Sequence, residues 1–503
     1  MIPAEQADIA AFLARLAGGP PIETHISAVF RGADTVWKLK KAVRLSFLDF
    51  SDRDARRHFT EREFALNAGA APGLYRDVAA VIRRADGTLA RVPAPADDAT
   101  VVDWVLRMAR VPDGQFLDEI AAQGALTEAL QDELGDVVAA YHAGLAPLPG
   151  TDPATAMARV IDGNAEAARG AGLAGEQVAA WQARVTGLLG QHAGTLRARA
   201  ARGLVRHCHG DLHLGNLCRW GGKIVPFDAL EFDEALASID LGYDLAFLLM
   251  DLDQRAGRAA ANRVMNRYLA RTGDVEITRF LPMFLSCRAL IKAHVVARSG
   301  AGNITRSGAG GRAQTYLAAA LAYLQSPAAA IIAIGGLPGT GKSSLARALA
   351  PGLGRAPGAV VLRSDEIRKR LHNAAPEQRL PPAAYTEAVS TEVFATLAEQ
   401  ACQIAAGGQA VIADATFLDP AHRRQIAVAA RNAGVAFRGI WLTAPLPVLE
   451  QRIAARTADA SDATVAVLHA ARQRDTGDLT WTNIDATDDA AAIRQAQEVL
   501  RSA

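Results

Sequence analysis

Residues 336–344 have the types and spacing of a loop that binds phosphate groups. They read Gly-Leu-Pro-Gly-Thr-Gly-Lys-Ser-Ser, follow an apolar run at 329–335 expected as a strand, and open a helix expected over 341–350. Glycines let backbone N–H groups turn toward phosphate oxygens, and the helix N-terminus adds a favourable partial charge. We predict that Lys342 neutralises the β- and γ-phosphates of a nucleotide and that Ser343 holds Mg²⁺. The expected nucleotide-binding residues are Gly336, Pro338, Gly339, Thr340, Gly341, Lys342, Ser343 and Ser344.

Acidic side chains stand at the ends of two further expected strands. Asp414 ends the run at 409–413, and we expect it to act on Mg²⁺ or its water shell, with a helix N-cap as the alternative role. Asp365 follows the expected strand at 359–363, at the carboxyl edge where α/β proteins bind ligands. It is predicted to accept the proton of an attacking hydroxyl, with capping again the alternative, while Arg368 holds phosphate or sugar oxygens of the substrate.

Two arginines lie four residues apart on an expected helix of the same region. Arg452 and Arg456 therefore project from one helix face. We expect them to close over a bound nucleotide and to stabilise the charge on the transferring phosphoryl group. The alternative is that both are solvated surface side chains.

A second group of chemically competent residues lies far upstream. Asp211 and Asn216 are five positions apart in the run 209–216, and Asp228 ends the short expected strand that follows. Protein kinases have the same spacing between a catalytic Asp and a metal-binding Asn, followed by a metal-binding Asp. Asn216 and Asp228 supply the oxygen ligands that suit Mg²⁺. Asp211 is predicted to orient or deprotonate a substrate hydroxyl.

Other polar residues near Asp211 are expected to support it. The neighbouring histidines suggest zinc, but a zinc site needs a second ligand cluster of suitable spacing, which the sequence lacks. We therefore expect His209 to be a buried, hydrogen-bonded support of the loop. Asp240 and Asp244 lie four apart at the start of a helix, and we expect both to cap it or to form salt bridges to the catalytic loop.

The elements that must position the upstream residues begin with strands. The pattern predicts an antiparallel hairpin within 24–48 and another formed by 78–82 and 89–92. A helix is expected from Arg53 to Asn67, with Asp49 or Ser51 as its N-cap. A helical pattern then dominates to about residue 325, interrupted by a region of strands and loops at 205–232.

The whole chain has 503 residues, more than one hydrophobic core usually organises, so two or three domains are expected. We predict one domain at 1–325, with an N-lobe at about 20–105 and a C-lobe at about 106–325, and another at 328–503, after a linker near 325–327. In the last domain expected strands alternate with helices, which predicts a parallel, doubly wound α/β sheet.

Composition limits the classes of function. The formal net charge is +1, so nucleic acid is an unlikely partner, and no apolar run is long enough to cross a membrane. The four cysteines form no paired motif, and no secretory signal precedes residue 30, so a reducing, cytoplasmic location is expected.

Residues 329–480 resemble the small P-loop kinases of the gluconate kinase, zeta-toxin and polynucleotide kinase group. The matching pieces are the phosphate loop, Asp365 with Arg368, the run 414–423, and Arg452 with Arg456. The resemblance implies phosphorylation of a hydroxyl on a metabolite or a nucleic-acid end, with ATP as donor, GTP not being excluded, and Mg²⁺ as the metal.

The upstream region resembles the aminoglycoside phosphotransferase family over about residues 20–325, through the run 209–216 and the later Phe-Asp at 228. The resemblance implies an α+β protein-kinase-like fold with a small β lobe and a helical C-lobe. It also implies a lysine on the third strand that pairs with a helix glutamate.

Sequence leaves alternatives for that ion pair, namely Lys38 or Lys40 as the lysine and Glu63 or Glu61 as the glutamate. The run 101–107 would form a hinge whose backbone reads adenine, so the expected nucleotide-binding set includes Lys38, Lys40, Glu63, Asp103 and Val105. No glycine-rich loop precedes the lysine strand.

The expected architecture is thus a protein-kinase-like α+β domain fused to an α/β P-loop domain with a parallel sheet. The expected function is a bifunctional ATP-dependent phosphotransferase, in which each domain phosphorylates a hydroxyl of a small molecule, such as a sugar or related metabolite. The alternatives are one active kinase with a nucleotide-sensing regulatory domain, or a nucleic-acid-end or toxin-like kinase.

Overall fold

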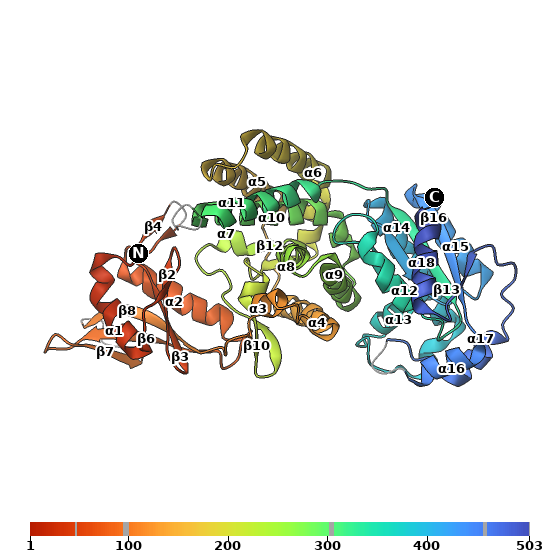
Figure 1. Ribbon diagram of the computed structural model, residues 1–503, viewed down its shortest axis with the longest axis horizontal. Helices are drawn as coiled ribbons and strands as arrows, with labels where there is room; N and C mark the ends of the chain where they lie inside the picture. The colour runs from red at the N-terminus through yellow and green to blue at the C-terminus, as the bar shows by residue number, and fades with distance from the viewer. Residues whose placement is uncertain (46–47, 94–99, 301–305, 456–459, 502–503) are drawn as a thin grey trace. The chain divides into compact units, whose positions relative to one another are not determined.

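The computed structural model describes residues 1–45, 48–93, 100–300, 306–455 and 460–501 (Figure 1). The chain forms two compact units, each assembled from separate stretches. Unit 1 comprises Met1–Leu126, Tyr141–Ala156 and Ala193–Leu248, and unit 2 comprises Thr127–Ala140, Met157–His192 and Leu249–Ala503.

The main sheet of unit 1 has six antiparallel strands in the order β1-β2-β3-β8-β6-β7. Both expected hairpins are confirmed, since β2 pairs with β3 and β6 pairs with β7. The strands are β1 (Ile22–Glu23), β2 (Ser27–Arg31), β3 (Thr35–Lys40), β6 (Tyr75–Arg83), β7 (Leu89–Pro93) and β8 (Val101–Ala109). A short pair, β4 (Arg44–Leu45) and β5 (Leu48–Asp49), follows β3. Helix α1 (Ala7–Ala17) packs its apolar face on the sheet.

Helix α2 (Arg53–Asn67) has the predicted limits and packs against β8 and β6 (Figure 1). Its N-cap is Asp52, whose carboxylate accepts a hydrogen bond from the backbone of Ala55 at 3.0 Å. The predicted caps were wrong, because Asp49 instead accepts both hydrogen bonds of Ser51, at 2.5 and 3.0 Å. A cap must directly precede the first helical residue in extended backbone, which only Asp52 does here.

The remaining strands of unit 1 form two small antiparallel pairs around the residues expected to be catalytic. Strand β9 (Val205–His207) pairs with β12 (Ser238–Asp240), and β10 (Leu217–Trp220) pairs with β11 (Lys223–Pro226). These pairs hold the loop at 208–216 and the segment at 227–231. The helices that follow β8 in the chain are α3 (Leu117–Ala122), α4 (Glu128–Gly144), α5 (Pro153–Gly170), α6 (Gly175–Ala201), α7 (Glu234–Ala237) and α8 (Leu241–Arg255). Most of α4, α5 and α6 belongs to unit 2, and α8 is divided between the two units.

Unit 2 contains a five-stranded parallel sheet in the order β14-β15-β13-β16-β17, which confirms the predicted doubly wound α/β architecture. The strands are β13 (Ala330–Gly336), β14 (Val360–Arg363), β15 (Val411–Asp414), β16 (Ala436–Thr443) and β17 (Thr482–Asp485). Strand β17 was not predicted, because Ile484 is the one apolar residue in its four. No helix in the described part of the chain combines the length and apolarity that crossing a membrane requires.

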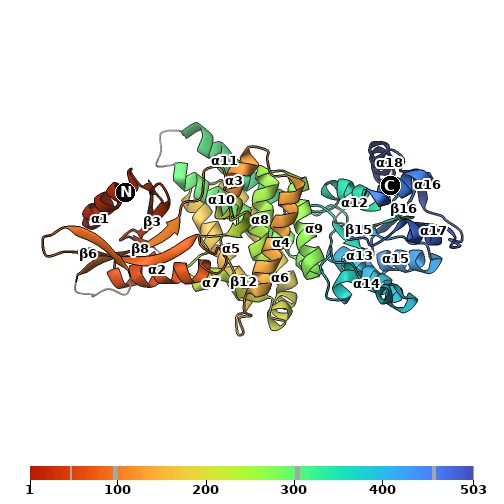
Figure 2. The same cartoon turned by 90° about the horizontal axis from the view of Figure 1, so that it is seen from below.

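Helices cover both faces of this parallel sheet. Helices α12 and α18 pack together on one face, and α14 and α15 on the other (Figure 2). The helices of unit 2 that follow α8 are α9 (Arg258–Thr272), α10 (Leu281–Gly300), α11 (Arg306–Ala322), α12 (Lys342–Leu349), α13 (Ser364–Leu371), α14 (Glu387–Ala406), α15 (Pro420–Ala433), α16 (Leu446–Ala454), α17 (Val465–Arg472) and α18 (Asp489–Arg501).

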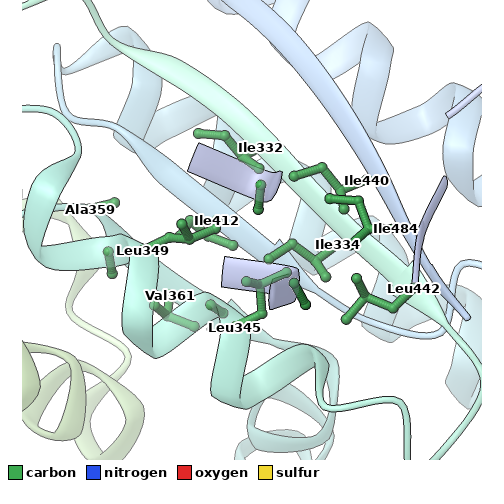
Figure 3. Packing of buried hydrophobic residues seen from close by; sticks show 14 of the residues in the cluster. Ile332, Ile334, Leu345, Leu349, Ala359, Val361, Ile412, Ile440, Leu442 and Ile484 are labelled. Atoms are coloured by element: carbon green, nitrogen blue, oxygen red, sulfur yellow. The ribbon is translucent and has the colours of Figure 1, made fainter. Parts of the chain in front are cut away.

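The core under α12 explains why the phosphate loop is held firmly. Ile332 and Ile334 of the central strand β13 pack against Leu345 and Leu349 of α12, and all four are buried (Figure 3). Burial of each such side chain contributes about 1.5–3 kcal/mol of transfer free energy. The loop between β13 and α12 is therefore anchored on both sides.

The edge strand β14 is covered by helix α9 within unit 2. The Asn266 side chain pairs with the strand backbone, because its Oδ1 accepts from the N–H of Val361 at 2.7 Å and its Nδ2 donates to the carbonyl of Ala359 at 3.2 Å. The Asn262 Nδ2 donates to the same carbonyl at 3.0 Å. Two side-chain amides thus satisfy edge groups that would otherwise invite pairing with another chain.

Candidate active sites

The loop between β13 and α12 depends on glycines at defined positions. Gly336 and Gly339 have φ of 142° and 87°. A Cβ atom at Gly336 would lie 2.6 Å from the carbonyl oxygen of Leu442, and one at Gly339 would lie 2.8 Å from that of Leu449. Both distances are shorter than real contacts of a Cβ atom, so the loop conformation requires glycine at both positions.

The polar end of this loop brings together two residues that the sequence predicted as metal ligands. The Ser343 hydroxyl donates to Oδ2 of Asp414 at 2.5 Å. This contact follows from the parallel pairing of β13 with β15, which aligns Ile334 with Asp414 at the carboxyl ends of both strands. A hydroxyl and a buried carboxylate are the hard oxygen donors that Mg²⁺ accepts, so the residues fit this ion. Lys342 bends back over the loop and donates to the carbonyls of Gly336 and Leu337, at 3.0 and 2.9 Å.

Sequence reasoning missed Arg363, the last residue of β14. Parallel pairing sets it opposite Asp414, with its Nε 3.4 Å from the Asp414 Oδ2. Its Nη1 lies 3.3 Å from Oε1 of Glu366, whose pKa is raised by burial. The sequence feature that could have identified Arg363 is its position at the end of an expected strand, two residues before the predicted Asp365.

A cavity of about 670 Å³ extends from the phosphate loop across the ends of β14 and β15. Its walls include most of the residues predicted for this site. Of the predicted set it contains Pro338, Gly339, Gly341, Lys342, Ser343, Ser344, Asp365, Arg368, Asp414 and Arg452. Thr340 is buried behind the loop, where its hydroxyl donates to the carbonyl of Leu337 at 2.8 Å.

Asp365 lies in the first turn of α13, whose N-cap is Arg363, so it does not occupy the cap position that was its alternative role. Burial raises its pKa, and the neighbouring Arg363 and the Ser461 hydroxyl work in the opposite direction. A carboxylate with a raised pKa beside the phosphate loop has the property expected of a proton acceptor.

The arginines predicted for this site are largely engaged with the protein. Arg368 is buried, donates to the carbonyl of Ala384 at 2.8 Å, and lies over the ring of Tyr385 at 5.0 Å. Arg452 donates to the carbonyl of Ala486 at 2.8 Å and pairs with Asp489 at 2.9 Å. Arg452 therefore joins α16 to the start of α18 at the rim of the cavity.

The other predicted arginine, Arg456, lies outside the described residues.

In unit 1, both lysines of β3 reach the same helix carboxylate. The Nζ atoms of Lys38 and Lys40 lie 2.7 Å from Oε1 and Oε2 of Glu63, respectively. Glu61, the alternative partner, instead pairs with Arg57 at 3.0 Å on the surface. Residues 38 and 40 share a strand face, so one glutamate can serve both.

Each lysine also contacts a carboxylate on the segment that follows β11. Lys38 Nζ lies 2.5 Å from Oδ1 of Asp228, the predicted metal ligand. Lys40 Nζ contacts Oε1 of Glu231, a residue that sequence reasoning missed. Burial disfavours the charged form of Glu63, but the two lysines outweigh this and lower its pKa to about 2. Burial likewise opposes the charge on Lys38, yet Asp228 and Glu63 raise its pKa well above the usual value.

The loop that carries Asp211 is held in place by hydrogen bonds to its backbone. Asn216 Nδ2 donates to both the carbonyl and the Oδ2 of Asp211, at 3.0 Å each, and the side-chain Oδ1 of Asn216 is the oxygen that suits a metal. His209 is buried, burial lowers its pKa, and its Nε2 lies 2.9 Å from the carbonyl oxygen of Phe227. His209 thus supports the loop as expected.

The two aspartates at the start of α8 have different partners. Asp244 accepts from the backbone N–H groups of His209 and Gly210, at 3.2 and 2.9 Å, so it supports the loop that carries Asp211 through hydrogen bonds to the backbone and not through the expected cap or salt bridge to the loop. Asp240 directly precedes α8 and accepts from the N–H of Gly242 at 2.8 Å, which confirms the predicted cap. It also forms a buried pair with Arg199, with N–O distances of 2.8 and 3.1 Å.

Asp228 adopts a backbone conformation that is rare for residues other than glycine. Its φ is 61°, and its N–H donates to the hydroxyl of Tyr75 at 2.9 Å. The preceding Phe227 donates to the carbonyl of Asn216 at 3.0 Å, which brings the two predicted metal ligands together. Strained backbone at a residue with ligand chemistry is typical of functional sites.

The predicted roles of Asp103 and Val105 in reading adenine are wrong. Val105 lies inside β8, opposite Leu39 of β3 and Ala79 of β6, so neighbouring strands enclose its backbone. Asp103 is fully buried and accepts from Gln6 and Arg56 at 2.7 and 3.0 Å. An internal strand has no backbone groups left for a ligand, and the chain leaves the sheet only after Ala109.

Comparison with known proteins agrees with this geometry. Residues 331–476 match the family model of the AAA domain. Two curated proteins described as uncharacterized, one from Mycobacterium tuberculosis (strain ATCC 25618 / H37Rv) and one from Mycobacterium bovis (strain ATCC BAA-935 / AF2122/97), are each 28% identical over 501 residues. The alignment with either covers 96% of this chain and 95% of the relative.

Solved structures match each part separately. A gluconokinase from Sinorhizobium meliloti 1021 covers 35% of this chain and 94% of its own, with 20% identity and a TM-score of 0.26. A choline/ethanolamine kinase family protein from Mesorhizobium loti covers 64% of this chain and 96% of its own, with 17% identity and a TM-score of 0.39.

Because these scores are low, the fold assignments rest on the sheet orders, the site geometry and the family match. The parallel sheet and the match of residues 331–476 confirm the expected α/β P-loop fold, and the six-stranded antiparallel sheet followed by helices agrees with the expected α+β architecture upstream.

Proposed function

We propose that the chain is a bifunctional ATP-dependent phosphotransferase with two separate active sites. Each site transfers the γ-phosphoryl group of ATP to a hydroxyl of a small molecule, such as a sugar or a related metabolite. The observation that carries the proposal is that each site assembles a lysine, a carboxylate suited to act as base, and oxygen donors suited to Mg²⁺. The domain limits proposed from the sequence, 1–325 and 328–503, place one site in each domain.

In the P-loop site, Lys342 and the backbone N–H groups of residues 339–343 bind the phosphates of ATP. Ser343 and Asp414 hold the magnesium ion, which neutralises charge on the phosphate oxygens when it is bound. Asp365, which lines the same cavity, takes the proton of the acceptor hydroxyl. Arg452 stands at the rim, where it stabilises the charge on the transferring group.

In the kinase-like site, Lys38 binds the α- and β-phosphates while Glu63 fixes its direction. Asn216 and Asp228 are the residues that hold magnesium there. Asp211 orients the acceptor hydroxyl and receives its proton, and Asn216 keeps its carboxylate in position.

Single substitutions in the full chain test whether both sites are active. We expect Lys342→Ala to remove one phosphorylated product and Asp211→Asn to remove another, measured by mass spectrometry after incubation with ATP and a library of hydroxyl metabolites. General base loss of this kind lowers turnover by about 10²–10⁴-fold. If both variants lost the same product, one domain would be a regulator of the other and not a second enzyme. Failure of the wild type to phosphorylate any acceptor would contradict the proposal.

A further inference from the structure

Lys40 and Glu231 are buried charged residues of unit 1 that have no role in the proposed function. Lys40 is 1% exposed, and Glu231 is 5% exposed. Lys40 contacts Glu231 and also lies 2.7 Å from Glu63. Isolated buried charges are costly, and an apolar pair of similar volume is often as stable, so such a pair is weak evidence for a role in stability alone.

The position of this pair relates it to the predicted metal ligand. Glu231 follows Asp228 by three residues, and Lys40 follows Lys38 by two. Glu63 accepts from both lysines through its two different oxygens, and each lysine then reaches one carboxylate of the segment 228–231. Two parallel bridges therefore join helix α2 to this segment.

The backbone of the same segment is fixed on several sides. The N–H of Ala229 donates to Oδ1 of Asn67 at 2.9 Å, and that of Leu230 donates to the carbonyl of His209 at 2.9 Å. Asn67 itself donates to the carbonyl of Glu63 at 2.8 Å. Helix α2 thus holds the segment directly through Asn67, and indirectly through Glu63, whose partner Lys40 of β3 contacts Glu231. Asp228 alone in this segment combines a positive φ with a side chain that is 41% exposed.

We propose that Lys40 and Glu231 are positioning residues that hold Asp228 in its strained conformation and direct its carboxylate toward the metal of the kinase-like site. The buried bridge from Lys40 to Glu231 restrains the end of the segment, while Asp228 remains open toward solvent at its start. This inference rests on the proposed function of that site. Both side chains are buried, so we assign them an action through Asp228 and not on the reacting groups.

The test measures metal binding, because a purely structural pair would not affect it once the protein is folded. All variants carry Lys342→Ala, which weakens nucleotide binding at the P-loop site. In this background we compare the parent with Glu231→Gln and with Lys40→Met/Glu231→Met. Arg107→Met is the matched control, since it breaks the Arg107–Asp77 pair of the same sheet outside the site. Thermal unfolding shows which variants are folded.

The probe is Mn²⁺, whose binding to each variant with a non-hydrolysable ATP analogue is followed by electron paramagnetic resonance. Loss of groups that orient a metal ligand typically weakens metal binding by about 10–100-fold. We expect a loss of that size in both site variants, no change in Arg107→Met, and unchanged binding of the analogue without metal.

The possible results separate the inference from the proposed function. Unchanged Mn²⁺ affinity in a folded site variant would overturn the positioning role alone. An equal loss of analogue binding with and without metal would also overturn it, because the pair would then act on the nucleotide. If the double variant does not fold, the Mn²⁺ affinity of Glu231→Gln decides whether the positioning role holds, because Lys40 keeps Glu63 as its partner in that variant. If the parent showed no metal-dependent binding at all, the proposed function of this site would fall, and the inference with it.

Discussion

The two candidate sites are built in different ways. The P-loop site takes its phosphate-binding groups from one continuous run, and its shape depends on backbone conformation at Gly336 and Gly339. The kinase-like site takes its groups from β3, α2 and two loops, and long-range ion pairs hold them together. Here Lys38 and Asp228, which contact one another, are 190 residues apart in the chain.

This difference affects how each site should fail. A site whose shape depends on backbone conformation should be disrupted by added side-chain volume. Changing the charge of the residues that surround such a site should have little effect. A site built on buried ion pairs is sensitive to the loss of one charged partner, because the remaining charge stays buried without compensation. The predictions below test this contrast in order of decreasing effect.

The largest effect is expected from Lys40→Met, which leaves Glu63 and Glu231 with one fewer partner in a buried setting. Breaking a buried pair from one side costs about 3–5 kcal/mol of unfolding free energy. Urea denaturation measures this, with Arg107→Met as the control from a half-exposed pair, for which about 0–1 kcal/mol is expected. A loss below that of the control would show that the buried network does not support the fold.

Acid should weaken the kinase-like half through Glu63. The folded pKa of Glu63 is lowered to about 2, below the usual 4.5. Its contribution is therefore fully present above pH 4.5 and is lost as the pH falls toward 2. The shift corresponds to about 3 kcal/mol. Denaturant unfolding from pH 6 to pH 2 should show a smaller fall in stability for Glu63→Gln than for wild type.

Glu61→Gln provides the matched control for that experiment, because Glu61 pairs with Arg57 on the surface of the same helix. Its stability should follow the wild-type pH dependence within about 0.5 kcal/mol. Identical pH dependence in the wild type and both variants would contradict the assignment of Glu63 as the shared partner of the lysines.

Gly339→Ala should damage the P-loop site by shape alone. The substitution adds a Cβ that would meet the Leu449 carbonyl at 2.8 Å, at a φ of 87° that side chains disfavour. Strain of this kind costs about 1–3 kcal/mol, so nucleotide affinity at this site should fall by up to about 100-fold. Titration of a fluorescent ATP analogue into a Lys38→Met background, which weakens nucleotide binding at the kinase-like site, measures it. Gly434→Ala is the control for backbone strain alone, because Gly434 also has a positive φ but a Cβ atom there would meet no other atom within 4 Å.

The smallest effect is expected at the edge of the parallel sheet. Asn266→Ala removes the amide that pairs with Val361 and Ala359, and should cost about 0.5–1.5 kcal/mol, because the N–H of Val361 loses its partner while the carbonyl of Ala359 keeps Asn262. Hydrogen exchange at the Val361 amide should rise in this variant. Unchanged exchange at Val361 would mean that α9 does not protect the edge of β14.

Much of this molecule could be predicted from patterns among residues that are close together in the sequence. The phosphate loop lies between an apolar strand and a helix, and the five-residue spacing of Asp211 and Asn216 occurs within one loop. Such features depend on neighbours in the chain, so periodicity and motif spacing report them directly. The limits of α2 were predictable for the same reason, although its cap was not.

Tertiary structure alone decided which distant residues meet. Glu63 was distinguished from Glu61 only by the face of α2 that packs toward β3, and Glu231 became visible only when Lys40 was placed beside it. The pairing of β8 between β3 and β6 enclosed Asp103 and Val105, and the pairing of β14 with β15 placed Arg363 at Asp414. Side-chain spacing along one chain says which groups share an element, whereas strand order and helix packing determine which elements are neighbours.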